Sequence, residues 1–154
     1  MPIVETVKGS ILDAPQKFIA HGVNCQNKMG SGVAKVLFDK YPIVKSSYHK
    51  FIRLCEFLLI NGQEDLLGMV DGVLVENEKF VLNCFTQEFY GYDRKKYLSY
   101  EAIRKCFTEI DGDNSIDEVA IPKIGCGLAG GDWEAVSIII DLCTPNTKIT
   151  VYEV

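Results

Sequence analysis

The sequence predicts an α/β fold in which one mixed sheet of about six strands lies between helices packed on both of its faces. Six apolar or β-branched segments of strand length share the chain with four segments of helical, 3.6-residue periodicity. Two of the strand-like segments are followed by glycine-rich loops that lead directly into helices, an arrangement typical of α/β proteins. With 154 residues, 47% of them hydrophobic and 24% charged, the chain has the size and composition of one globular domain, and we treat residues 1–154 as a single domain.

The first half of the chain contains two predicted strands and two predicted helices. A turn-like stretch of glycine, serine, aspartate and proline separates the strands. The dipeptide Tyr41-Pro42 is expected to end the first helix, because a proline disfavours the helical conformation of the residue before it. Apolar residues in the second helix recur every three or four positions. The predicted bounds are Ile3–Val7 and Phe18–Val23 for the strands, and Gly32–Lys40 and Val44–Leu59 for the helices.

The second half begins with two strand-like runs joined by a tight polar turn at Asn77-Glu78, a spacing that predicts an antiparallel hairpin. A helix, a short buried strand, a second helix and a closing strand follow. Asp132 directly precedes the second of these helices and is predicted to be its N-cap. The hairpin strands are predicted at Leu66–Glu76 and Lys79–Thr86, the helices at Tyr97–Ile110 and Trp133–Cys143, and the remaining strands at Glu118–Ile124 and Lys148–Val154.

The composition excludes several classes of protein. A formal net charge of −5 leaves no broad basic surface, so general binding to nucleic-acid phosphates is not expected. The six cysteines include no C-x-x-C pair and the two histidines are far apart, so we expect no metal site and no cofactor. The first residues do not resemble a secretory signal, and no apolar run is long enough to span a membrane. Free cysteines without a signal favour a reducing, cytoplasmic location, and we expect a monomer.

The two glycine-rich loops are the candidate ligand-binding segments. In α/β sheets, ligands bind beyond the carboxyl ends of strands, where helix N-termini offer backbone amides and partial positive charge to a phosphate. The first loop, within His21–Ala34, carries Gly30 and Gly32, which either expose amides to a ligand or only permit a tight turn. The second, Ile121–Trp133, matches G-x-G-x-x-G, but only 24 residues follow the match, too few for the rest of a dinucleotide-binding domain. A hollow of backbone amides that binds an anion is the interpretation that fits this loop.

Four motifs, in the order in which they occur, resemble those of the macro domain family, whose fold binds ADP-ribose. They are V-K-G-S-I, H-G-V-N-C-Q-x-x-x-G-S-G-V-A, N-C-F-T-Q and I-P-K-I-G-C-G-L-A-G-G-D-W. The resemblance covers essentially the whole chain and implies a macro-domain-like three-layer sandwich. Within the family, the sequence most resembles the stand-alone ADP-ribose 1″-phosphate phosphatases, and less closely the terminal ADP-ribose protein glycohydrolases.

The resemblance implies a pose for ADP-ribose. The turn of Gly9, Ser10 and Ile11 would face the adenine, although many macro domains have an aspartate where this chain has Ser10. Tyr152 would flank the same adenine, and Asn24 would bond the distal ribose. The other expected contacts are Gly30, Ser31, Gly32 and Val33 on the distal ribose and diphosphate, Gly125, Cys126, Gly127, Leu128 and Ala129 on the other side of the diphosphate, and Gln87 at the cleft.

The resemblance also bears on the reaction. The glycohydrolase branch uses a lysine after a strand-end threonine and an aspartate after G-C-G-L, where this chain has Gln87 and Ala129. The phosphatase-like members implicate a histidine near the first loop and an aspartate near the second, which correspond to His21 and Asp132. Both residues have an alternative interpretation. His21 lies in an apolar run typical of a core residue, and Asp132 is a favoured helix cap.

We therefore expect metal-independent hydrolysis of the terminal phosphate of ADP-ribose 1″-phosphate, with His21, Asn24 and Asp132 as the catalytic residues. One alternative is a module that binds ADP-ribose without turnover. Another is a de-ADP-ribosylating hydrolase that acts through a water positioned by the loops. The expected partner is ADP-ribose or ADP-ribose 1″-phosphate, with no nucleic acid and no membrane.

Overall fold

A single sheet of six strands organises the computed structural model, which describes residues 3–25, 32–58, 66–87, 98–126 and 130–153. The strand order is β1-β6-β5-β2-β4-β3. Each neighbouring pair is parallel except β3 and β4, which form an antiparallel hairpin at one edge. The prediction of a mixed sheet of about six strands is therefore confirmed. The strands are β1 Ile3–Lys8, β2 Phe18–Asn24, β3 Val70–Glu76, β4 Lys79–Gln87, β5 Glu118–Ile121 and β6 Lys148–Glu153.

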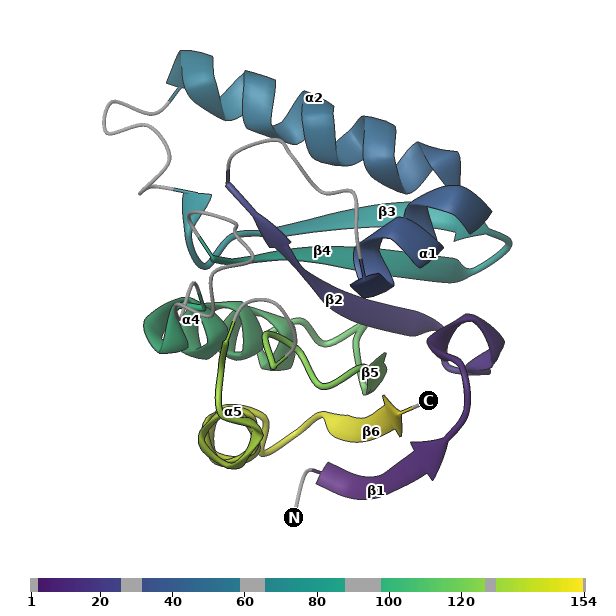
Figure 1. Cartoon of the computed structure of the whole chain (residues 1–154), viewed down its shortest axis with the longest axis vertical. Helices are drawn as coiled ribbons and strands as arrows, with labels where there is room; N and C mark the ends of the chain where they lie inside the picture. The colour runs from purple at the N-terminus through teal and green to yellow at the C-terminus, as the bar shows by residue number, and fades with distance from the viewer. Residues whose placement is uncertain (1–2, 26–31, 59–65, 88–97, 127–129, 154) are drawn as a thin grey trace.

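Helices cover both faces of the sheet, which confirms the three-layer arrangement. Figure 1 shows α1 and α2 on one side of the strands and α4 and α5 on the other. Each side has its own cluster of buried apolar side chains, one beneath α1 and α2 and one beneath α4 and α5. The helices are α1 Gly32–Lys40, α2 Pro42–Leu58, α4 Tyr100–Asp111 and α5 Trp133–Cys143, with a short 3-10 helix at Ile11–Asp13.

Strand β2 lies inside the sheet, between β4 and β5, and is buried on both faces. Ile19 and Val23 pack into the cluster beneath α1 and α2, whereas Phe18 and Ala20 pack into the cluster beneath α4 and α5. This burial on both sides explains why the segment is a continuous apolar run rather than an alternating one. His21 is the polar exception in the middle of the strand.

Two strands are shorter than predicted, for local reasons. Strand β3 begins at Val70 rather than at Leu66, because Gly68 takes a positive φ of 91° and donates its N–H to the Phe85 carbonyl in a turn. Strand β5 ends at Ile121 rather than at Ile124, because Pro122 has no N–H to continue the ladder.

Two helix starts also differ from the prediction. Helix α2 begins at Pro42, because a proline at the first helical position loses no intrahelical hydrogen bond. Helix α4 begins at Tyr100, where the Ser99 hydroxyl caps it by accepting the Ala102 N–H at 3.1 Å. No helix among the described ranges has both the length and the apolar character needed to cross a membrane.

We expect Ser99→Ala to lower the free energy of unfolding by about 1 kcal/mol, because the first turn of α4 loses its cap. Chemical denaturation measures this change. Ser46→Ala is the matched control, because the Ser46 hydroxyl bonds only carbonyls of its own helix and is exposed. An equal loss in both variants would contradict the assignment of Ser99 as a cap.

Candidate functional site

The carboxyl ends of β2, β4 and β5 lie side by side where these strands end. We call this end of the sheet, at which the parallel strands terminate, the carboxyl edge. β2 is parallel to both neighbours, and its last residue, Asn24, pairs with Gln87 at the end of β4. The chain runs from β2 into α1 on one face and from β5 into α5 on the other. The two predicted glycine loops therefore follow neighbouring parallel strands. The helices that follow them begin on opposite faces.

The loop after β5 is closed by its own backbone. The Gly131 N–H donates to the Gly125 carbonyl at 2.7 Å, and Leu98 packs against both glycines. A Cβ added at either glycine would lie 2.5 Å from a Leu98 methyl group, and Gly125 also has a positive φ of 76°. These two positions therefore require glycine. The expected contacts Gly127, Leu128 and Ala129 lie outside the described residues.

The Cys126 thiol lies in the same loop and donates to the Ile124 carbonyl at 3.3 Å. Burial raises its pKa, and the negative charge of the nearby Asp132 raises it further. A thiol with a raised pKa is protonated at neutral pH, so it is a poor nucleophile. This environment fits a packing role or a contact to a ligand.

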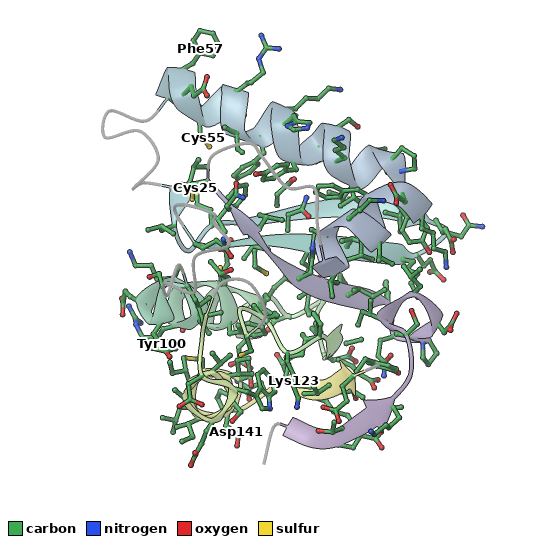
Figure 2. The ribbon with its side chains drawn as sticks, in the orientation of Figure 1. Cys25, Cys55, Phe57, Tyr100, Lys123 and Asp141 are labelled. Atoms are coloured by element: carbon green, nitrogen blue, oxygen red, sulfur yellow. The ribbon has the colours of Figure 1, made fainter. Side chains whose placement is uncertain are left out.

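Asp132 is the N-cap of α5, as predicted. Its carboxylate accepts the Glu134 N–H at 3.0 Å and is exposed at the start of the helix. Its own N–H donates to the hydroxyl of Tyr100 at 3.2 Å. Tyr100 projects from the start of α4 toward α5 (Figure 2) and joins the two helices at the end of the glycine loop. Nothing in the sequence pattern identified Tyr100.

A salt bridge joins the loop after β5 to the neighbouring strand β6. The Lys123 ammonium lies 2.6 Å from the Glu153 carboxylate, beside β6 in Figure 2. Its hydrogen bond and charge lower the pKa of the Glu153 carboxyl. The Glu153 main-chain carbonyl accepts the Gly9 N–H at 2.9 Å. Glu153 therefore connects the loop after β5 with the turn after β1.

The residues expected at the adenine are brought together at the ends of β1 and β6. Ser10 caps the 3-10 helix by accepting the Leu12 N–H at 3.2 Å, and Ile11 is buried in the cluster beneath α1 and α2. Tyr152 is half-buried on β6 and donates its hydroxyl hydrogen to the Gln16 side-chain carbonyl at 2.9 Å.

Part of the first loop is described and part is not. Gly32 begins α1 with a positive φ of 66° and is exposed, and Val33 is partly buried against the apolar cluster. Gly30 and Ser31 lie outside the described residues. Asn24 has no exposed surface, and the Tyr48 hydroxyl lies 2.8 Å from both its main-chain carbonyl and its Oδ1. Gln87 is half-buried at the carboxyl edge.

His21 lies three residues before the end of β2 and is closed off from solvent. Its Nε2 is 2.5 Å from the Asn83 Oδ1, and its ring meets the edge of Phe38 at 6.0 Å. The Asn83 amide nitrogen faces the Asp71 carboxylate at 3.3 Å, which turns Oδ1 toward the histidine, so Nε2 carries the hydrogen. The opposite ring nitrogen, Nδ1, has no partner. Burial lowers the pKa of His21 to about 4, only partly offset by the bond to Asn83.

The part of the chain that the structure describes holds no group of three or more histidine, cysteine, aspartate or glutamate side chains placed to bind a metal ion. The groups that these residues offer a ligand at the carboxyl edge are backbone amides and a few polar side chains.

Comparison with known proteins supports the resemblance seen in the motifs, although no protein-family model matches the chain. The ADP-ribose glycohydrolase OARD1 of Bos taurus is 30% identical over 95% of this chain and 88% of its own length. A macrodomain protein from Streptomyces coelicolor superimposes with a TM-score of 0.77 and 26% identity, covering 99% of both chains. The chain belongs to the macrodomain family. A Bacteroides thetaiotaomicron protein of unknown function is similar to this macrodomain at a TM-score of 0.82 and 29% identity, again over 99% of both chains.

Two other relatives are named for different hydrolytic reactions of ADP-ribose derivatives. The ADP-ribose 1″-phosphate phosphatase of Saccharomyces cerevisiae is 24% identical over 99% of both chains. The DNA ADP-ribosyl glycohydrolase of Mycobacterium tuberculosis is 28% identical over 83% of this macrodomain and 35% of its own length. All three named relatives are hydrolases of ADP-ribose derivatives.

We expect Gly125→Ala to lower the free energy of unfolding by about 2 kcal/mol, because its methyl group requires a strained backbone and displaces Leu98. Gly72→Ala is the matched control, because its Cβ would lie 3.5 Å from a Leu82 methyl group, an ordinary contact. Urea denaturation of both variants measures the difference. A Gly125→Ala variant as stable as Gly72→Ala would show that the loop is not fixed by Leu98.

We expect the free energy of unfolding to fall by about 2 kcal/mol between pH 7 and pH 5 because of His21. The folded pKa lies below the unfolded value of about 6.5, so the unfolded chain binds the extra proton. The stability that His21 contributes is therefore complete above pH 6.5 and is lost as the pH falls toward 4. Denaturation across this range measures the loss.

His21→Gln is the control for this pH dependence, because glutamine keeps an amide donor but does not titrate. Most of the slope between pH 7 and pH 5 should disappear in the variant. His49, whose pKa burial also lowers, accounts for a residual slope. An unchanged slope in His21→Gln would mean that the histidine is not buried in the neutral form.

Proposed function

We propose that this macrodomain binds ADP-ribose and hydrolyses the terminal phosphate of ADP-ribose 1″-phosphate. One observation carries the proposal: β2 and β5 are parallel neighbours whose carboxyl ends lead into helices on opposite faces of the sheet. A diphosphate lying across the carboxyl edge would meet the N-terminus of α1 on one side and that of α5 on the other. Helix N-termini and their backbone amides stabilise phosphate without requiring a basic surface, which suits a chain of net charge −5.

The rest of the pose follows from the order of the strands. Gly9, Ser10 and Tyr152, at the ends of β1 and β6, would hold the adenine at one side of the sheet. The distal ribose would then lie over β2 and β4, beyond Asn24 and Gln87. An extended ligand of this kind matches the span of neighbouring strand ends.

The choice between hydrolytic reactions rests on two departures from the glycohydrolase branch. OARD1 is a glycohydrolase, and the resemblance assigns that branch a lysine and an aspartate at the positions of Gln87 and Ala129. A glutamine amide does not form a Schiff base, so this chain lacks the covalent route through a lysine at this position. Transfer of the terminal phosphate to water needs neither group.

Of the three predicted catalytic residues, we assign the orientation of the attacking water to Asp132. Its carboxylate is exposed at the N-terminus of α5, where the partial positive charge of the helix offsets its repulsion from a phosphate. His21 and Asn24 have almost no exposed surface, and their catalytic roles stay predictions. The backbone amides would stabilise the charge of the transition state.

The test is ³¹P NMR of ADP-ribose 1″-phosphate incubated with the protein in excess chelator. We expect inorganic phosphate to appear while the diphosphate resonances of ADP-ribose persist. Perturbed resonances without release of phosphate would indicate a binding module. Intact substrate together with release of ADP-ribose from a modified protein would favour de-ADP-ribosylation, to which the 30% identity with OARD1 points.

Asp132→Asn separates the chemistry of Asp132 from its cap, because asparagine caps helices as well as aspartate does. We expect phosphate release to slow about 100-fold while the affinity for ADP-ribose changes by no more than a few fold. Asp132→Ala, which removes both functions, should in addition be less stable. Full activity in Asp132→Asn would limit Asp132 to a structural role.

A further inference from the structure

Tyr48 on α2 makes a buried contact with the end of β2 that the proposed function does not use. Its hydroxyl lies 2.8 Å from the Asn24 main-chain carbonyl and 2.8 Å from the Asn24 Oδ1. Both residues are fully buried. A hydroxyl that reaches a main-chain oxygen fixes the backbone as well as a side chain, so this contact acts on the strand end itself.

The strand ladder is irregular at the same place. Val23 pairs with Phe85, but Asn24 pairs with Gln87, so Thr86 is an extra residue on β4 opposite this step. Such a bulge interrupts regular pairing and bends the strand that carries it. The pairing at the end of β2 is therefore irregular, although the Cys25 N–H still donates to the Gln87 carbonyl at 3.0 Å. A bond from outside the sheet adds a further constraint on Asn24 at this step.

Tyr48 is itself held rigidly by its surroundings. Its ring is stacked on Phe85 and tilted against Phe38, with centroids 5.8 Å away in each case. The preceding residue, Ser47, donates to the buried Asp71 carboxylate of β3 at 2.9 Å. Helix α2 is thus bonded to β3 through Ser47 and to β2 through Tyr48. Because the Tyr48 ring is held in place, its hydroxyl restricts the position of Asn24.

We propose that Tyr48 is a positioning residue for the ligand site. By sharing its hydroxyl hydrogen between the two oxygens of Asn24, it fixes the end of β2 and the Asn24 side chain that is expected to bond the distal ribose. The effect on the ligand rests on the proposed function. The effect on the backbone does not, and the two are tested separately.

The variant is Tyr48→Phe, which keeps the ring and its stacking and removes only the hydroxyl. Tyr41→Phe is the matched control. The Tyr41 hydroxyl is part-buried and bonds a different strand, through the Glu76 carboxylate of β3 at 3.1 Å. Glu76 is the last residue of β3 and pairs with Lys79, the first residue of β4. The Tyr41 contact therefore lies at the end of the sheet opposite to the carboxyl edge. Both variants should lower the unfolding midpoint by similar amounts.

We expect calorimetric titration with ADP-ribose to show about fivefold weaker binding in Tyr48→Phe and unchanged binding in Tyr41→Phe. The loss should be smaller when Tyr48→Phe is made in an Asn24→Ala background, because the hydroxyl then keeps only the main-chain carbonyl as a partner. An unchanged affinity in Tyr48→Phe would overturn the proposal.

An NMR spectrum without ligand tests the backbone effect directly. Tyr48→Phe should shift the Asn24 side-chain amide and the backbone amides of Asn24 and Cys25, and Tyr41→Phe should leave all three in place. If these resonances do not move in Tyr48→Phe, the positioning role is overturned, whether or not the protein binds ADP-ribose. A wild-type protein that does not bind ADP-ribose would overturn the proposed function instead, while the spectrum still decides whether Tyr48 positions the strand end.

Discussion

The burial of polar side chains in the central strand is the constraint on which much of the structure depends. β2 is covered on both faces, yet it carries His21 and Asn24, both essentially without exposed surface. A polar group removed from water is tolerated only when it is hydrogen-bonded. Asn83 of β4 supplies the partner for His21, and Tyr48 of α2 supplies one for Asn24. Helix α2 and strand β4 therefore supply the hydrogen-bond partners that make the burial of these two side chains less costly.

The parallel arrangement of five strands explains why the proposed site lies at the carboxyl edge. Parallel strands end together, and each must be followed by a connection that returns to the other end of the sheet. The helices of these connections begin at the carboxyl edge, so their unpaired amides gather there. An acidic protein can bind an anion at such an edge because the attraction is local and comes from the backbone. The surface charge of the chain can then vary without loss of the site.

Much of the fold could be predicted from the sequence, because the periodicity of apolar residues reports directly which side of an element is buried. The bounds of α5 and its Asp132 cap were predicted correctly, since a cap is decided within a few residues. The start of β3 was not predicted correctly, because it depends on a hydrogen bond between Gly68 and Phe85, which lie far apart in the sequence. Tyr48 and Tyr100 were missed for the same reason. A tyrosine on the apolar stripe of a helix, such as Tyr48, is the one signal that could have indicated a buried hydroxyl contact.

A site built from backbone amides depends on the sequence in a different way from a site built from side chains. A backbone amide cannot be removed by substitution, so the residues that decide function are those that shape the chain behind the ligand. A positive φ requires glycine at position 125, and the nearby Gly125 carbonyl requires it at position 131, with Leu98 packed against both. The Tyr48 hydroxyl holds the end of β2. His21 belongs to the same class. A buried imidazole whose pKa lies near 4 is neutral at pH 7 and fixed in one tautomer by Asn83, which suits support of the strand better than proton transfer. Buried support of the backbone at the carboxyl edge is consequently the property on which the proposed binding and turnover would both depend.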